Sequence, residues 1–234
     1  MRKEEFTIGD YLHVYNRGNR KQPIVFDEND KKHFLECLYY FNADISIPNI
    51  FNELRKKNFK FNLKWPQDWP ARKPLVTILA FVLMPNHFHL LLKEITDGGT
   101  AKFMQKLGTG LTNYFNEKYN ESGSLFQGSY KAKRVATDSY LGYLSAYIQL
   151  KNPLELMSGG LAKAQNNFEE AFRWAVNYPY SSLNVYATNA PSPIIDKEIL
   201  GELFPKADQY NDFCSDCITG MVLDDTLKDI VFEE

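Results

Sequence analysis

Two neighbouring apolar runs constrain the fold more than any other feature of this sequence. The runs, LVTILAFVLM and HFHLLLKE, span residues 75–84 and 87–94 and are joined by Pro85 and Asn86. β-Branched and aromatic residues favour strands, and a Pro-Asn pair favours a turn. The sequence therefore predicts a hairpin of two buried strands.

Further elements surround this hairpin in a recognisable order. The alternating segment YLHVYN predicts a strand over residues 11–16 that ends near Gly18, and a helix with Asp27 as its N-cap is expected next. Residues 98–123 show helical spacing between glycines, and a fourth strand and a helix capped by Asp138 follow. This order predicts an α+β fold: a ferredoxin-like, split βαβ antiparallel sheet with helices on one face.

The remaining segments predict an insertion and a C-terminal extension. Residues from about 42 to 74 contain many lysines and several prolines, which is typical of a loop insertion. After Pro153 the periodic patterns weaken to short helices and turns. We therefore expect one domain over residues 1–153 and a small, mainly helical, acidic extension over residues 154–234.

The net charge of -2 hides a difference between these two parts. Residues 1–151 contain 22 basic and 15 acidic residues, whereas residues 152–234 contain 5 and 14. A net charge of +7 on the first part fits a nucleic-acid partner, because phosphate contacts need Lys and Arg. The chain has no apolar run of membrane-spanning length and no signal-peptide core, so we expect a cytoplasmic protein that does not contact membranes.

The cysteines give little functional information. Cys37, Cys214 and Cys217 are too few for a disulfide framework. Cys214 and Cys217 have the spacing of half a zinc site, but no second cysteine pair or nearby histidine completes it.

A histidine pair lies at the start of the second strand of the hairpin. Because successive strand side chains point to opposite faces, His87 and His89 share one face, and Phe88, Leu90 and Leu92 take the other. Two imidazoles on a rigid strand can bind one divalent cation and leave positions for a phosphate oxygen and water. The spacing also fits a polar pair at the start of a strand, so both interpretations are open at this point.

Four motifs taken together resemble the single-tyrosine HUH transposases, which are the IS200-like insertion-sequence transposases. In chain order the motifs are YLHVYNRGNRKQPIVF, MPNHFHLLL, YFNEKYNESGSLFQGSYKA and YIQLKNP. Within that family they are most similar to the REP-associated tyrosine transposases. The resemblance implies a transposase that nicks and rejoins single-stranded or hairpin DNA through a 5′-phosphotyrosine. It further implies Mg²⁺ or Mn²⁺ on His87 and His89, with Tyr114 as the nucleophile.

The resemblance leaves the third metal ligand open. In related transposases a Gln often lies one helical turn after the tyrosine, but this position is Lys118, whose ammonium cannot bind a cation. Glu117 and His13 are the alternatives, and His13 is equally consistent with a structural histidine. Without the family pattern, Tyr114 would be interpreted as a core residue. The tyrosines at 140, 143 and 147 are interpreted mainly as packing residues of the last helix.

Basic residues near these motifs are the expected DNA contacts. Lys and Arg follow phosphates while aromatic side chains stack on bases, although a charge run is more often only a solvated face. The expected DNA-binding residues are Arg17, Arg20, Lys21, Lys131, Lys133 and Arg134.

Three alternatives stay open at the level of the sequence. A domesticated DNA-binding protein would keep the transposase fold without cleaving DNA. The chain is expected to act as a monomer or a homodimer. Gly108 and Gly110, inside the helix that carries Tyr114, mark either a hinge or close-packing positions, and we favour close packing.

Overall fold

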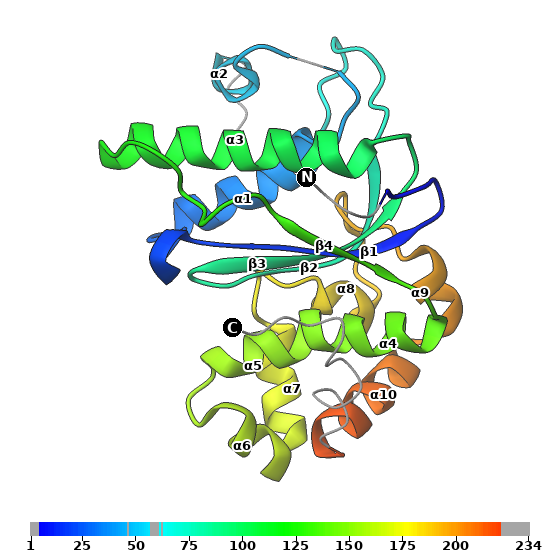
Figure 1. Ribbon diagram of the computed structural model, residues 1–234. Coiled ribbons are helices and arrows are strands. Elements are labelled where there is room, and N and C mark those ends of the chain that lie inside the picture. Colours follow the sequence, from blue (N-terminus) through cyan, green and yellow to red (C-terminus); the bar gives the residue numbers. More distant parts are fainter. Residues whose placement is uncertain (1–4, 46, 57–60, 62, 221–234) are drawn as a thin grey trace.

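A four-stranded antiparallel sheet lies at the centre of the computed structural model, which describes residues 5–45, 47–56, 61 and 63–220 (Figure 1). The strand order is β2-β3-β1-β4, so β1 and β3 are the central strands. The strands are β1 (Tyr11–Arg17), β2 (Val76–Leu83), β3 (His87–Glu94) and β4 (Lys131–Val135). This is the α+β, split βαβ sheet that the sequence predicts, and its hairpin lies at the predicted residues.

Two long helices cover one face of the sheet. They are α1 (Glu28–Tyr40) and α3 (Gly99–Tyr119), and α2 (Ile50–Lys56) lies beyond them within the predicted insertion (Figure 1). Asp27 is the N-cap of α1, as predicted, because its side chain accepts from the backbone amides of Asn29 and Asp30. The apolar side chains on this face of the sheet include Leu12, Val14, Phe88, Leu90 and Leu92, and they share one core cluster with α1 and α3.

The second face is covered by α4 and the C-terminal extension. A short 3₁₀ turn (Asn19–Lys21) follows β1, and a π-helical turn (Tyr147–Lys151) joins α4 to α5. The helices of this layer are α4 (Asp138–Ala146), α5 (Asn152–Leu156), α6 (Gly160–Asn166), α7 (Phe168–Val176), α8 (Leu183–Thr188), α9 (Glu198–Leu203) and α10 (Ala207–Thr219).

The extension shares a core with the sheet. Strand residues such as Val82 and Leu91 belong to one apolar cluster with Leu154, Phe172 and Tyr210. The helices of the split βαβ unit lie on one face, as predicted, and the extension forms a third layer on the other. The expected boundary at residue 153 falls inside a helical stretch, and residues 221–234 of the predicted extension lie outside the described part.

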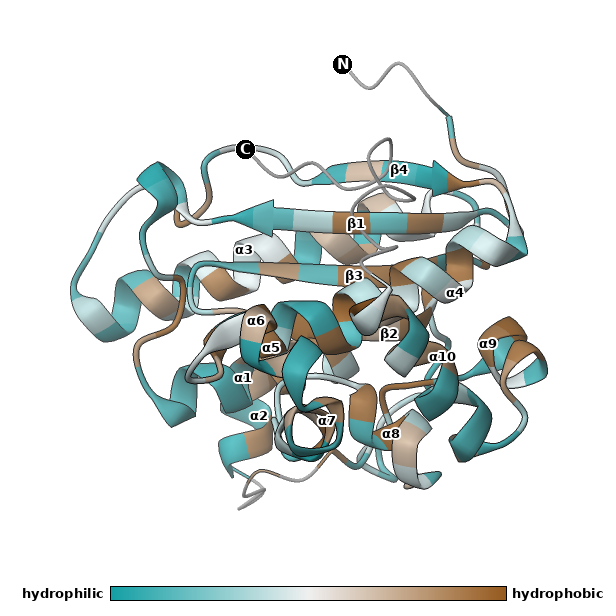
Figure 2. Ribbon diagram, turned by 90° about the horizontal axis from the view of Figure 1, so that it is seen from below, coloured by the Kyte–Doolittle hydropathy of each residue, from teal (hydrophilic) through white to brown (hydrophobic). Residues whose placement is uncertain are grey.

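The third layer covers only part of the face of the sheet on which it lies. Figure 2, viewed from the side of the extension, shows the helices lying mainly over β2 and β3, while β1 and β4 extend beyond them. The π-helical turn is in contact with β2 and β3. Several side chains of β1 and β4 on this face are accordingly half-buried or exposed, namely Tyr15, Arg17, Lys131 and Lys133.

The cap of α4 differs from the prediction by one residue. Thr137 is extended (φ −137°, ψ 152°), and its side chain accepts a hydrogen bond from the amide of Tyr140. Asp138 is therefore the first helical residue, where its carboxylate faces the positive end of the helix. Thr and Asp are both good N-caps, so the sequence alone does not decide between adjacent candidates.

The C-x-x-C pair lies inside the core of the extension. Cys214 and Cys217 are both buried on α10. Burial raises the pKa of the Cys217 thiol to about 12 and that of Cys214 well above its usual range. Both thiols are therefore protonated packing groups at neutral pH.

None of the described helices is long and apolar enough to span a bilayer.

Candidate nucleic-acid processing site

Three histidines lie together on the face of the sheet that carries α4 and the extension, called the histidine face below. His13 on β1 lies beside His89 on β3, with Nε2 of His13 2.9 Å from Nδ1 of His89. The ring of His87 is 5.1 Å from that of His89, and its Nδ1 lies 2.7 Å from Oδ1 of Asn86. The predicted sharing of one face by His87 and His89 is confirmed, and His13 lies beside them.

His89 is held in its neutral form. It is 5% exposed, and burial lowers the pKa of its imidazole well below the usual range. His13, His87, Lys151 and Arg17 lower this pKa further. A neutral imidazole has a free lone pair, so the surroundings favour the form that binds a metal.

The donor set fits a divalent cation held by two nitrogens. Nδ1 of His87 donates to Asn86, so the lone pair of this neutral ring lies on Nε2. When Nδ1 of His89 donates to His13, the lone pair of His89 likewise lies on Nε2. Within the described ranges no three side chains of His, Cys, Asp or Glu are grouped as a metal site, so a substrate oxygen and water would complete the coordination.

A tyrosine from the π-helical turn reaches this cluster. Tyr147 is 3% exposed, and its ring centroid lies 5.6 Å from that of His89 and 6.4 Å from that of His13. Tyr147 belongs to a buried core cluster, as the packing interpretation has it, and Tyr143 packs on Phe213, but the contact of Tyr147 with the histidines was not predicted. The signal was present in the sequence, because Tyr147 lies inside YIQLKNP, one of the motifs that carry the family resemblance.

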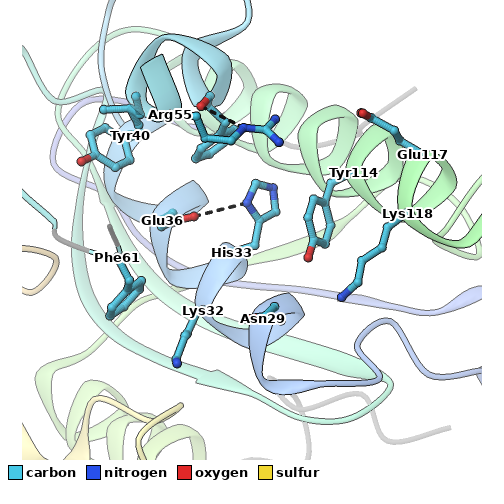
Figure 3. A pocket seen from close by; sticks show the side chains of 12 residues that line it. Asn29, Lys32, His33, Glu36, Tyr40, Arg55, Phe61, Tyr114, Glu117 and Lys118 are labelled. Atoms are coloured by element: carbon cyan, nitrogen blue, oxygen red, sulfur yellow. Dashed lines mark hydrogen bonds and ion pairs between the residues drawn. The ribbon is translucent and has the colours of Figure 1, made fainter. Parts of the chain in front are cut away.

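Tyr114 lies on the opposite face of the sheet. Its hydroxyl donates to Asp30 at 3.0 Å, and its ring stacks on His33 at 4.0 Å. Burial and the neighbouring Asp30 raise the pKa of Tyr114 to about 12, which opposes a nucleophilic role. The two rings lie side by side at the wall of a cavity of about 600 Å³ between α1, α2 and α3 (Figure 3).

Tyr114, the nucleophile that the resemblance implies, therefore lies on the other side of the sheet from the HUH pair, and the reason is visible in the strand pattern. The apolar residues Phe88 and Leu90 define the face that α1 and α3 must cover, and His87 and His89 point away from it. Glu117 is on α3 as well, exposed beside the cavity, so it does not approach the histidines.

Lys118, at the expected position of a third ligand, has a structural role. It forms ion pairs with Asp27 and Asp30. Burial alone would raise the pKa of Asp30, but hydrogen bonds from Lys118, Tyr119 and two backbone amides outweigh it and lower this pKa to about 2. Asp30 therefore fixes the C-terminal half of α3 to the start of α1.

The predicted DNA-binding residues separate into three groups. Lys131 and Lys133 pair across the sheet with Tyr15 and His13, so they lie on the histidine face, as does Arg17 opposite His87. Arg134 pairs with Leu12 on the other face and forms an ion pair with Asp10 at 2.9 Å. The exposed 3₁₀ turn after β1 carries the remaining two residues, Arg20 and Lys21.

Comparison with known proteins gives a family match and a weak structural likeness. Residues 67–151 match the family described as "Transposase IS200 like". A solved structure of a REP-associated tyrosine transposase bound to a REP hairpin is similar with a TM-score of 0.44 and 12% identity, over 84% of this chain and 93% of that chain. No curated protein matches the chain.

Proposed function

We propose that this chain is a DNA strand transferase with Tyr147 as its nucleophile, since its residues 67–151 match the model of the IS200-like transposases. One observation carries the assignment: Tyr147 is in ring contact with His89 on the face where His13, His87 and His89 meet. A tyrosine hydroxyl is a weak nucleophile at neutral pH, so it needs positive charge at the phosphate that it attacks. Arg17, Lys131 and Lys133 on the histidine face offer such charge.

The reaction exchanges one phosphate ester for another. The hydroxyl oxygen of Tyr147 forms a bond to phosphorus, and the bond from phosphorus to the 3′ oxygen of the DNA breaks. The tyrosine loses its proton and the 3′ oxygen takes one up, so the products are a 5′-phosphotyrosine and a free 3′ hydroxyl. Attack by a second 3′ hydroxyl reverses these steps and rejoins the strand without a nucleoside triphosphate.

His87 and His89 would hold the divalent cation, Mg²⁺ or Mn²⁺, in this proposal. When bound, such a cation offsets negative charge on the scissile phosphate. Asn86 and His13 orient the two imidazoles through their Nδ1 atoms. The burial of His89 keeps its ring neutral and excludes water from one side of the site.

Single-stranded or hairpin DNA would lie over the open half of the histidine face. Arg17, Lys131 and Lys133 lie there within the register of β1 and β4, and Tyr15 stacks on His89 at 5.5 Å. Cations that follow phosphates beside an aromatic ring suit an unpaired strand. Arg20 and Lys21 extend the basic surface past the end of β1.

A non-cleaving DNA-binding protein is the second candidate function. The burial of Tyr147 and His89, at 3% and 5% exposure, favours it, because a scissile phosphate must reach both side chains. In this case the basic half of the histidine face would bind DNA without forming a covalent product.

The test is covalent capture of DNA by the full chain. Labelled single-stranded hairpin oligonucleotides are incubated with Mn²⁺ and run on a denaturing gel beside Tyr147→Phe, Tyr114→Phe and His89→Ala. We expect an adduct with the wild type and with Tyr114→Phe, and none with the other two variants. An adduct that needs Tyr114 instead of Tyr147 would overturn the assignment. Salt-sensitive binding without an adduct in any form would favour the second candidate.

A further inference from the structure

Lys151 is a buried lysine at the end of the π-helical turn that carries Tyr147. It is 5% exposed, and its Nζ lies 5.0 Å from the centroid of the Tyr147 ring. The two residues are four apart on one helical turn, so their side chains leave the backbone in the same direction. The ammonium of Lys151 is therefore positioned at the tyrosine and not in solvent.

Lys151 and Arg17 lie near the histidine pair from two different elements. The Tyr147 ring that Lys151 contacts lies 5.6 Å from the ring of His89, and Arg17 pairs with His87 across the sheet. The carboxylate of Glu155 lies 3.4 Å from Nζ, which is a long ion pair, and its side chain is 41% exposed. Two positive charges beside these imidazoles form an electropositive site that suits an anion.

We infer that Lys151 binds the scissile phosphate, through an ion pair between its ammonium and a non-bridging phosphate oxygen beside Tyr147. The inference rests on the proposed function, because it assigns the phosphate to that site. Lys151 forms no covalent bond and keeps its protons throughout the exchange described above. Its charge stabilises the phosphate while negative charge develops, and it holds the phosphate next to the attacking oxygen.

The first test removes the two charges of this contact one at a time. The cut position is mapped with natural DNA, and a matched oligonucleotide then carries an uncharged methylphosphonate there. We expect Lys151→Met to slow adduct formation about 100-fold on the natural strand. Lys151→Arg keeps the positive charge and should slow it much less. On the methylphosphonate strand the wild type and Lys151→Met should react at similar rates. Equal slowing on both strands would show a structural role and overturn the inference.

A second test measures binding and does not need cleavage. In a Tyr147→Phe background, the affinity for hairpin DNA is measured against salt with and without Lys151→Gln. Loss of one phosphate contact should reduce the slope of log affinity against log salt by about 0.7. An unchanged slope would overturn the inference even if the wild type forms no adduct, whereas absence of the adduct alone would overturn only the proposed cleavage.

Lys163→Met is the matched control for both tests. Lys163 pairs with Glu170 on the exposed surface of α6 and α7, with 42% and 50% of the two side chains exposed. Its replacement should leave the adduct rate and the salt slope at their wild-type values. Thermal unfolding of each variant shows that the full chain is folded, so a slow Lys151 variant is not mistaken for an unfolded one.

Discussion

Nε2 of His13 on β1 lies 2.9 Å from Nδ1 of His89 on β3, so a neighbouring strand supplies the hydrogen-bond partner of a proposed metal ligand. Two neutral imidazoles can share only one proton across such a contact. If His89 donates it, the ligand nitrogen of His89 is free, and His13 acts as the orienting group. His13 is thus explained without being a third ligand.

Replacement of His13 by Ala should weaken Mn²⁺ binding. Outer hydrogen-bond partners of metal-binding histidines typically change affinity by about 10–100-fold. The measurement is a calorimetric titration of Mn²⁺ into the full chain without DNA. His33→Gln is the control, because His33 lies on the opposite face beside Tyr114. Equal affinity of His13→Ala and the wild type would contradict the orienting role.

Tyr114→Phe should lower the stability of the fold and leave the formation of the DNA adduct unchanged. The substitution removes the hydrogen bond to Asp30, which keeps its other donors from Tyr119, Lys118 and two backbone amides. The free energy of unfolding should fall by about 1 kcal/mol, the usual net value of one hydrogen bond. Urea unfolding measures this loss. A variant as stable as the wild type would show that the hydrogen bond contributes nothing.

Local patterns in the sequence were sufficient for much of the fold. The alternation along β1 and β3 places their side chains on two faces, and Asp27 with Asp30 forms a capping box that fixes the start of α1. The cap at Thr137 and the third layer were not predictable in the same way. Adjacent capping residues compete locally, and the packing of the extension depends on contacts between residues far apart in the chain, such as Val82 and Tyr210.

The site was predictable only where a strand determined it. The period of two places His87 and His89 together, and the ferredoxin-like order places His13 beside them. The contact of Tyr147 with the histidines was not predicted, because an aromatic residue at helical spacing is usually a packing residue. Its side chain reaches the histidines from a π-helical turn that packs on β2 and β3, and no helical periodicity predicts that contact.

Acid should remove the contribution of Asp30 to stability. Its folded pKa of about 2 is below the usual 3.8, so the carboxylate stabilises the fold fully above the unfolded value and loses this effect as pH falls towards 2. The shift corresponds to about 2 kcal/mol. The difference in unfolding free energy between the wild type and Asp30→Asn should be constant near neutral pH and shrink below about pH 4. A difference that persists unchanged at pH 2 would contradict this account.

Gly108 and Gly110 on α3 should respond oppositely to alanine. A Cβ at Gly110 would overlap the ring of Phe41, whereas a Cβ at Gly108 would meet no atom within 4 Å. Gly108→Ala should therefore raise the free energy of unfolding by about 1 kcal/mol, the difference in helix propensity. Gly110→Ala should lower it, because overpacking costs about 1–3 kcal/mol and exceeds that gain. Urea unfolding of the two variants compares them directly. Equal stabilisation by both would mean that Phe41 moves aside freely, and that Gly110 is not a close-packing position.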